Sequence, residues 1–154
     1  MNTVEKSAPA ITLFTIGYGR KSARQFFGIL KAAGVRKVID VRLNNTSQLA
    51  GFTKKDDLAF FLEAIAGMGY GHRPELGPTS EMLDDYRSGG VAWPEHERRL
   101  RALFAQRGIE NLMSPWDMDL ACLLCVEPSP DRCHRRIAAE HLQEHWGSVT
   151  VRHL

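Results

Sequence analysis

The sequence has no long apolar run, and no stretch approaches the roughly 20 apolar residues that a transmembrane helix needs. Its opening, MNTVEKSAPA, lacks the basic-then-apolar order of a signal peptide. Cysteine is scarce too, and three cysteines in 154 residues do not make a disulfide scaffold. We therefore expect a cytosolic protein with reduced thiols and no membrane partner.

An excess of charge of one sign is also missing. The 20 lysines and arginines nearly balance the 18 aspartates and glutamates, which gives a net charge of +2, and there is no concentrated basic run. Surfaces that bind nucleic acid or membranes usually carry more positive charge than this. Nucleic acid therefore stays open as a partner, but the net charge does not support it.

Apolar runs rich in β-forming residues alternate with segments of helical periodicity. The strands are predicted over 11–19, 35–43, 70–76, 119–127 and 148–154, and the helices over 22–34, 53–69, 129–147 and, as a pair, 79–107. This alternation predicts right-handed crossovers and a mainly parallel sheet. We expect one three-layer, Rossmann-like α/β domain over 11–154, with about five strands and helices on both faces, after a flexible segment at 1–10.

Residues that favour helix ends set the expected boundaries. Ser22, Thr53 and Ser129 are predicted N-caps, and Pro94 is predicted to begin the second helix of the middle pair. The core stripes of two helices are expected at Leu58, Phe61, Leu62 and Ile65 and at Leu100, Leu103 and Phe104.

Four of the predicted strands end in a glycine turn or in polar residues. These ends hold Gly17 and Tyr18, then Asp40, Arg42 and Asn44, then His72, and finally Glu127. Because ligands of open α/β sheets lie outside the carboxyl ends of the strands, we expect a binding site there. The Gly17-Tyr18-Gly19 turn could present backbone N–H groups to an anion. It lacks the third glycine of a dinucleotide fingerprint, since that position is Ser22, so no such cofactor is expected.

The stretch CVEPSPDRCHRRIAAEHL, from Cys125 to Leu142, combines a helix start with reactive side chains. A cysteine near a helix N-terminus and beside arginines, as Cys133 is here, can have a lowered thiol pKa. Arg135 shares a helical face with apolar residues and should point inward, where it could pair with Glu127 or Asp40 or bind an anion.

The spacing Cys122-x-x-Cys125 suggests a zinc half-site, but an odd separation on a strand sends the side chains to opposite faces. Two such thiols lie about 10 Å apart along a strand and cannot share one ion. Cys122 is therefore expected in the core. Cys125, Cys133 and His134 remain an unsupported alternative, and we expect no metal and no cofactor. His141, His145 and His153 are expected to be solvated.

Four segments resemble the DUF488 family of uncharacterised proteins: TIGYG (15–19), DVRLNNTSQLAGFTKKDDL (40–58), HRPELGPT (72–79) and CLLCVEPSPDRCHRRIAAEHL (122–142). The shared pattern is an Asp-Val-Arg strand, a Cys-x-Glu strand end and a Cys-His-Arg helix start. The resemblance implies a compact Rossmann-like domain whose site residues are Asp40, Arg42, Glu127, Cys133, His134 and Arg135. It implies no particular activity.

Three functions stay open at this point. The first is an enzyme for hydrolysis or group transfer on a small anionic, nucleotide-like or modified-base substrate. Its chemistry would come from a cysteine nucleophile, Cys133 or Cys125, with His134 or His72 as base, or from acid–base catalysis by Glu127 and Asp40. The second is a non-catalytic ligand-binding or nucleic-acid-processing accessory module. In the third, the charged groups of Asp40, Arg42, Glu127 and Arg135 form a buried network with a structural role only. The oligomeric state is not fixed by the sequence.

Overall fold

A computed structural model describes residues 10–46 and 50–154, and five strands form one parallel sheet in the order β3-β2-β4-β1-β5. The strands are β1 (Ile11–Gly17), β2 (Lys37–Asp40), β3 (Gly69–His72), β4 (Ala121–Cys125) and β5 (Val149–His153). The helices are α1 (Ala23–Ala33), α2 (Lys55–Ala66), α3 (Ser80–Arg87), α4 (Trp93–Arg107) and α5 (His134–Trp146). The predicted five-stranded parallel sheet is confirmed. Most of the segment predicted to be flexible, 1–9 of 1–10, lies outside the described residues.

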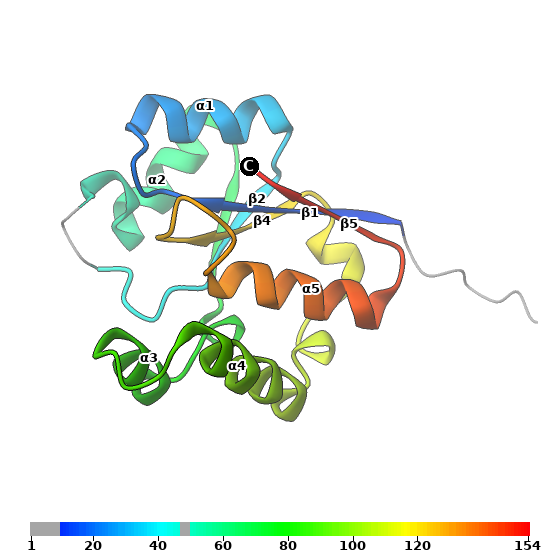
Figure 1. Ribbon diagram of the computed structural model, residues 1–154. Helices are drawn as coiled ribbons and strands as arrows, with labels where there is room; N and C mark the ends of the chain where they lie inside the picture. The colour runs from blue at the N-terminus through cyan, green and yellow to red at the C-terminus, as the bar shows by residue number, and fades with distance from the viewer. Residues whose placement is uncertain (1–9, 47–49) are drawn as a thin grey trace, which may run out of the picture.

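Helices cover both faces of the sheet, as predicted. Figure 1 shows α1 and α2 on one face and α5 on the other, with α3 and α4 packed beyond α5. Among the described residues, none of the helices is both long enough and apolar enough to cross a membrane.

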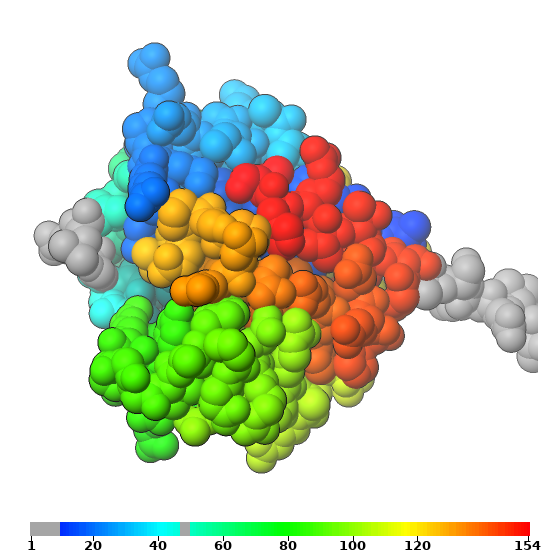
Figure 2. Space-filling model, in the orientation of Figure 1, coloured from blue at the N-terminus to red at the C-terminus, as the bar shows by residue number. Residues whose placement is uncertain are grey.

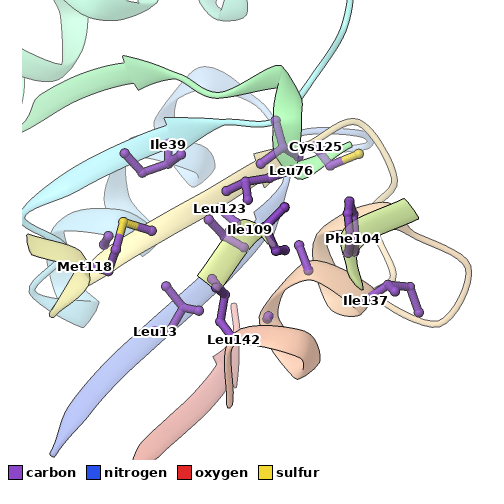
Figure 3. Packing of buried hydrophobic residues seen from close by; sticks show 14 of the residues in the cluster. Leu13, Ile39, Leu76, Phe104, Ile109, Met118, Leu123, Cys125, Ile137 and Leu142 are labelled. Atoms are coloured by element: carbon purple, nitrogen blue, oxygen red, sulfur yellow. The ribbon is translucent and has the colours of Figure 1, made fainter. Parts of the chain in front are cut away.

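The central strand β4 is buried at every position, which agrees with its nearly continuous apolar sequence. Cys122 and Leu124 pack into the cluster beneath α1 and α2. Leu123 and Cys125 face the opposite cluster, which α4 and α5 complete (Figure 3). Cys122 is therefore a core residue on the opposite face from Cys125, as the strand periodicity predicted.

The helices that follow two neighbouring strands lie on opposite faces of the sheet. The helix after β2 is α2, on one face, whereas the helix after the neighbouring strand β4 is α5, on the other face (Figure 1). Loops that leave adjacent strands in opposite directions separate from each other, and this is the place where open α/β sheets bind ligands.

Three predicted helix starts have different outcomes. Ser22 caps α1 as expected, in a capping box with Gln25. Thr53 does not cap α2, which begins at Lys55, because the Thr53 hydroxyl donates to a carbonyl within a short 3₁₀ turn. Ser129 does not cap α5, because its hydroxyl oxygen accepts the N–H of Asp131 in a local turn, and the helix begins only at His134.

The core positions of α2 and α4 also differ in part from their predicted stripes. Leu58 and Leu62 are buried in α2, whereas Ile65 is 45% exposed. In α4, Leu100 and Phe104 are buried and Leu103 is partly buried. The helix begins at Trp93, one residue before the predicted Pro94. Ile65 instead lines an open groove between α1 and α2.

Gly17 offers a direct test of how the strand ends pack. A Cβ atom at this position would lie 1.5 Å from the carbonyl oxygen of Glu127, whereas one at Gly28, exposed on α1, would meet nothing within 4 Å. We expect Gly17→Ala to lower the free energy of unfolding by about 1–3 kcal/mol or more because backbone must move. Gly28→Ala should raise it by about 0.5–1 kcal/mol. Urea unfolding measures both, and equal effects of the two substitutions would contradict the close approach.

Candidate functional site

A cavity of about 150 Å³ lies in the crevice at the carboxyl ends of β2 and β4. Figure 2 shows the segment that follows β4 meeting the α3–α4 region on the same face of the molecule. The wall consists of residues from the β2 end, from α3 and from the β4–α5 segment: Val41, Arg42, Leu43, Asn44, Pro78, Leu83, Tyr86, Arg87, Cys125, Val126, Glu127, Arg132 and His134.

Arg42 reaches the wall as part of a buried ion pair. Its Nε and Nη2 atoms each donate to a carboxylate oxygen of Asp40 at 2.8 Å, and Asp40 is completely buried. Burial acts to lower the pKa of Arg42, but the hydrogen bond and charge of Asp40 outweigh burial and raise it. The ring of Tyr18 lies 5.2 Å from the guanidinium and forms a cation–π contact. The pair therefore fixes the position of the Arg42 guanidinium at the cavity while Asp40 balances its charge.

Two neighbouring side chains donate hydrogen bonds to acceptor atoms of Asp40 and Arg42. The Tyr70 hydroxyl donates to Asp40 at 2.7 Å, and burial, followed by the carboxylate, raises the pKa of Tyr70. His72 donates from Nε2 to the carbonyl oxygen of Arg42 at 2.6 Å. Asp40 and His72 thus act through Arg42 and are not among the residues of the cavity wall.

Arg135 points inward, as its helical face predicted, and is completely buried. It does not pair with the carboxylate of Glu127 or with Asp40, the two expected partners. Its Nη1 atom donates to the Glu127 carbonyl oxygen at 2.6 Å and contacts the Cys133 sulfur at 3.1 Å, and Nε donates to the Thr15 hydroxyl at 3.2 Å. The charge of this arginine is thus directed at backbone, hydroxyl and sulfur.

Cys125 and Cys133 form a buried thiol pair beside this arginine. A hydrogen bond from Cys125, helped by the charge of Arg135, lowers the pKa of Cys133 to about 7. The same hydrogen bond and burial raise the pKa of Cys125. Cys125 reaches the cavity wall, whereas Cys133 is the N-cap residue of α5 and lies completely buried outside that wall. A thiolate is therefore favoured behind the cavity rather than on its surface.

His134 joins the cavity to α4 through a second histidine. Its Nε2 atom lies 3.0 Å from Nε2 of His96, so one imidazole donates and the other accepts. Burial, together with the charges of His96 and Arg87, lowers the pKa of His134 to about 4. The ring of Tyr86 stacks on His96 with centroids 4.6 Å apart. His134 is thus a neutral imidazole at pH 7, positioned on the cavity wall.

The Gly17-Tyr18-Gly19 turn does not present free N–H groups. The N–H of Tyr18 donates to the Cys125 carbonyl at 3.1 Å, and that of Gly19 donates to the Val126 carbonyl at 2.8 Å. The expected anion-binding role of this turn is therefore not supported. Its glycines instead allow β1 to approach the β4–α5 segment closely.

The structure brings only part of the predicted set to the cavity wall. Arg42, Asn44, Glu127 and His134 lie there, whereas Asp40, His72, Cys133, Arg135, Gly17 and Tyr18 lie behind or beside them. Sequence reasoning missed Arg87, Arg132, Tyr86 and His96. Arg132 stands within the Cys-His-Arg stretch, and this proximity was an available signal. The other three come from α3 and α4, whose position over the site leaves no local signature in the sequence.

A larger groove of about 470 Å³ lies between α1 and α2, lined by Phe27, Phe52, Phe61 and Ile65 together with a few polar residues. It holds no acid, histidine or cysteine. We take the smaller cavity as the candidate site because titratable groups converge there at the carboxyl edge of the sheet.

Comparison with protein families finds one match. Residues 22–142 match the family model described as domain of unknown function DUF488. The chain belongs to this family. The matched range includes Arg42 and the whole β4–α5 segment with its Cys-His-Arg start. Comparisons with curated proteins and with solved structures found no match. Any inference about function therefore starts from the fold and the side chains of this DUF488 domain.

The neutral His134 predicts acid sensitivity. In the unfolded chain its imidazole binds a proton below about pH 6.5, whereas in the folded DUF488 chain it stays neutral down to about pH 4. The free energy of unfolding should therefore fall as the pH falls from 6.5 to 4, by about 2 kcal/mol at pH 5. Urea unfolding at pH 7.5 and 5.0 should show a smaller loss in His134→Asn than in the wild type. The same loss in both proteins would contradict a buried neutral imidazole.

Proposed function

We propose that the protein is an enzyme that binds a small anion, or the anionic group of a nucleotide-like substrate, in the strand-end cavity and carries out hydrolysis or group transfer. The observation that carries this proposal is the composition of the wall. Three arginines, one carboxylate and one neutral imidazole converge on a single cavity. Titratable groups that converge in one cavity, here with a lowered pKa at His134, are typical of active sites.

Arg87 and Arg132 are the best candidates to hold the anion. Both are exposed, and in the described part of the chain neither forms an ion pair within 4.0 Å. Arg42, by contrast, is already neutralised by Asp40. Planar guanidinium groups suit bidentate binding of phosphate, sulfate or carboxylate oxygens. The charge available to a ligand therefore comes mainly from Arg87 and Arg132.

The size of the cavity favours a small ligand. Its volume of about 150 Å³ is below the roughly 300–1,000 Å³ typical of drug-sized ligands. An oxyanion or a phosphoryl group fits this space, whereas a base and a sugar would extend into solvent. Nucleotide-like substrates thus remain within the proposal through their phosphate, and a modified base alone is the less favoured substrate.

Two groups on the wall supply the proposed proton transfers. His134 is neutral at pH 7 and can take a proton from water or from an acceptor hydroxyl as it attacks, and because its pKa is lowered to about 4 the imidazolium that forms must pass that proton on at once. Glu127 is the carboxylate on the wall and can bind or release a proton at the leaving group. Because the Cys133 thiol is buried, water or a second substrate is preferred to this sulfur as the nucleophile. The predicted cytosolic location would keep the thiols reduced.

Ligand-dependent melting tests the anion site. We would measure wild type, Arg87→Gln and Arg132→Gln with phosphate, sulfate, nucleoside monophosphates and nucleosides. A ligand at 100 times its Kd adds about 2.7 kcal/mol, which raises Tm by about 5–10 °C in a chain of this size. The matched control is Arg98→Gln, because Arg98 is an exposed arginine on α4 paired with Glu95.

The proposal expects a shift in the wild type and the control that shrinks or disappears in the two cavity variants. Equal shifts in all four proteins would contradict it, as would a response to neutral nucleosides alone. Turnover separates an enzyme from the alternative, a non-catalytic binding or accessory module. Glu127→Gln and His134→Asn should then abolish product formation while leaving the melting shift in place.

A further inference from the structure

A second cluster of ligand side chains lies at the opposite end of α5 from the cavity. His141 and His145 are one helical turn apart, and Glu110 faces them from the short 3₁₀ helix η3 (Ile109–Asn111). Both histidines were expected to be solvated. That expectation is wrong for His141, whose side chain is only 8% exposed because its ring packs edge-on against Phe104.

The three side chains converge on a small volume. The His141 Nε2 atom lies 2.6 Å from one oxygen of Glu110, and the His145 Nε2 atom lies 3.7 Å from the other. The two imidazole rings are stacked with centroids 4.1 Å apart. One nitrogen or oxygen atom from each of the three residues lies within 4.8 Å of the other two.

The hydrogen bonds of His145 fix which of its nitrogens faces the carboxylate as an acceptor. Its Nδ1 atom lies 2.9 Å from the carbonyl oxygen of His141, and because a carbonyl can only accept, Nδ1 carries the proton. In the neutral ring, Nε2 then carries no proton, and its lone pair faces a carboxylate oxygen of Glu110. Two acceptors in this position repel each other unless a cation lies between them.

The surroundings favour a cation and hold its ligands in place. A ring N–H donated to a backbone carbonyl is the usual outer-shell support of a metal-binding histidine. The indole N–H of Trp146 donates to the Glu110 carbonyl at 3.1 Å and fixes η3 against the helix. His145 also stands in the last turn of α5, where the helix dipole favours positive charge.

We propose that Glu110, His141 and His145 bind a divalent transition-metal ion of the zinc type. Zinc–nitrogen distances of about 2.0–2.1 Å place tetrahedral ligand atoms about 3.3 Å apart, so the ion would replace the proton in the 2.6 Å hydrogen bond between His141 and Glu110 and draw His145 in from 3.7 Å. Two histidines and one glutamate leave the fourth position to water. The ion would join η3 to α5.

This site is independent of the proposed enzyme function. His134 on the cavity wall and His145 are eleven positions apart on one helix, or about 16 Å at 1.5 Å per residue. The failure of either proposal therefore leaves the other intact. A proton on His145 is the competing occupant, and the experiment separates it from a metal ion.

The test is zinc titration of the full-length chain after chelator treatment, followed by calorimetry at pH 7. The variants are His145→Ala and Glu110→Gln, and the control is Glu144→Gln, which removes an exposed carboxylate from the same helix. We expect one zinc ion per chain in the wild type and the control. Each cluster variant should bind at least tenfold more weakly. Because His145 is 42% exposed, His145→Ala should melt close to the wild type without metal.

Either of two results would overturn the proposal. One is a wild type that binds no zinc, which would leave a proton as the cation between Glu110 and His145. The other is equal zinc affinity in all four proteins, which would place the ion on the thiols or on the His96–His134 pair. Cobalt in place of zinc gives an independent spectroscopic check, because thiolate-to-cobalt charge-transfer absorption would likewise assign the ion to the cysteines.

Discussion

The buried guanidinium of Arg135 is the constraint on which the carboxyl edge of the sheet depends. Its side chain is completely enclosed, and among residues 10–46 and 50–154 no carboxylate lies within ion-pair distance. A buried charge without a partner is costly. The protein meets part of this cost with the Glu127 carbonyl, the Thr15 hydroxyl and the sulfur of Cys133, while the buried Nη2 atom has no hydrogen-bond partner among the described residues. Of these groups, only the sulfur can become an anion.

This requirement explains several local features together. The Glu127 carbonyl must turn inward to reach Arg135, so β1 has to end in a residue without a side chain, which is Gly17. The same carbonyl belongs to the segment after β4, which continues through the Ser129 turn until α5 begins at His134. This segment brings Arg132 and His134 to the cavity wall. One buried cation thus shapes both the fold of the junction and the chemistry beside it.

Much of the fold could be predicted from the sequence, because burial leaves a local pattern. The fully apolar run of β4 and the helical spacing of Arg135 with Ala138 and Leu142 indicated a parallel sheet and an inward-facing arginine. The false start at Ser129 had a physical cause as well. Its hydroxyl caps a local turn as readily as a helix, and nothing in the sequence separates the two.

The candidate site was harder to predict because its composition depends on contacts between distant segments. His96 meets His134 across 38 positions, and Arg87 reaches the cavity only because α3 and α4 pack beyond α5. Buried His141 was missed for the same reason, since η3 and α4 enclose it. Asp40 was correctly found at a strand end, but its neighbours Arg42 and Tyr70 use its oxygens and make it a positioning residue.

The central claim is that the hydrogen bond from Cys125, together with the charge of Arg135, lowers the pKa of the Cys133 thiol behind the cavity. The most direct measurement is an NMR titration that follows the Cβ carbon signal of each cysteine with pH. Cys133 should titrate with a pKa of about 7, while Cys122 and Cys125 stay protonated well above the pKa of an ordinary thiol, near 8.5. A Cys133 signal that titrates together with the other two, or above them, would show that the buried guanidinium is balanced in some other way.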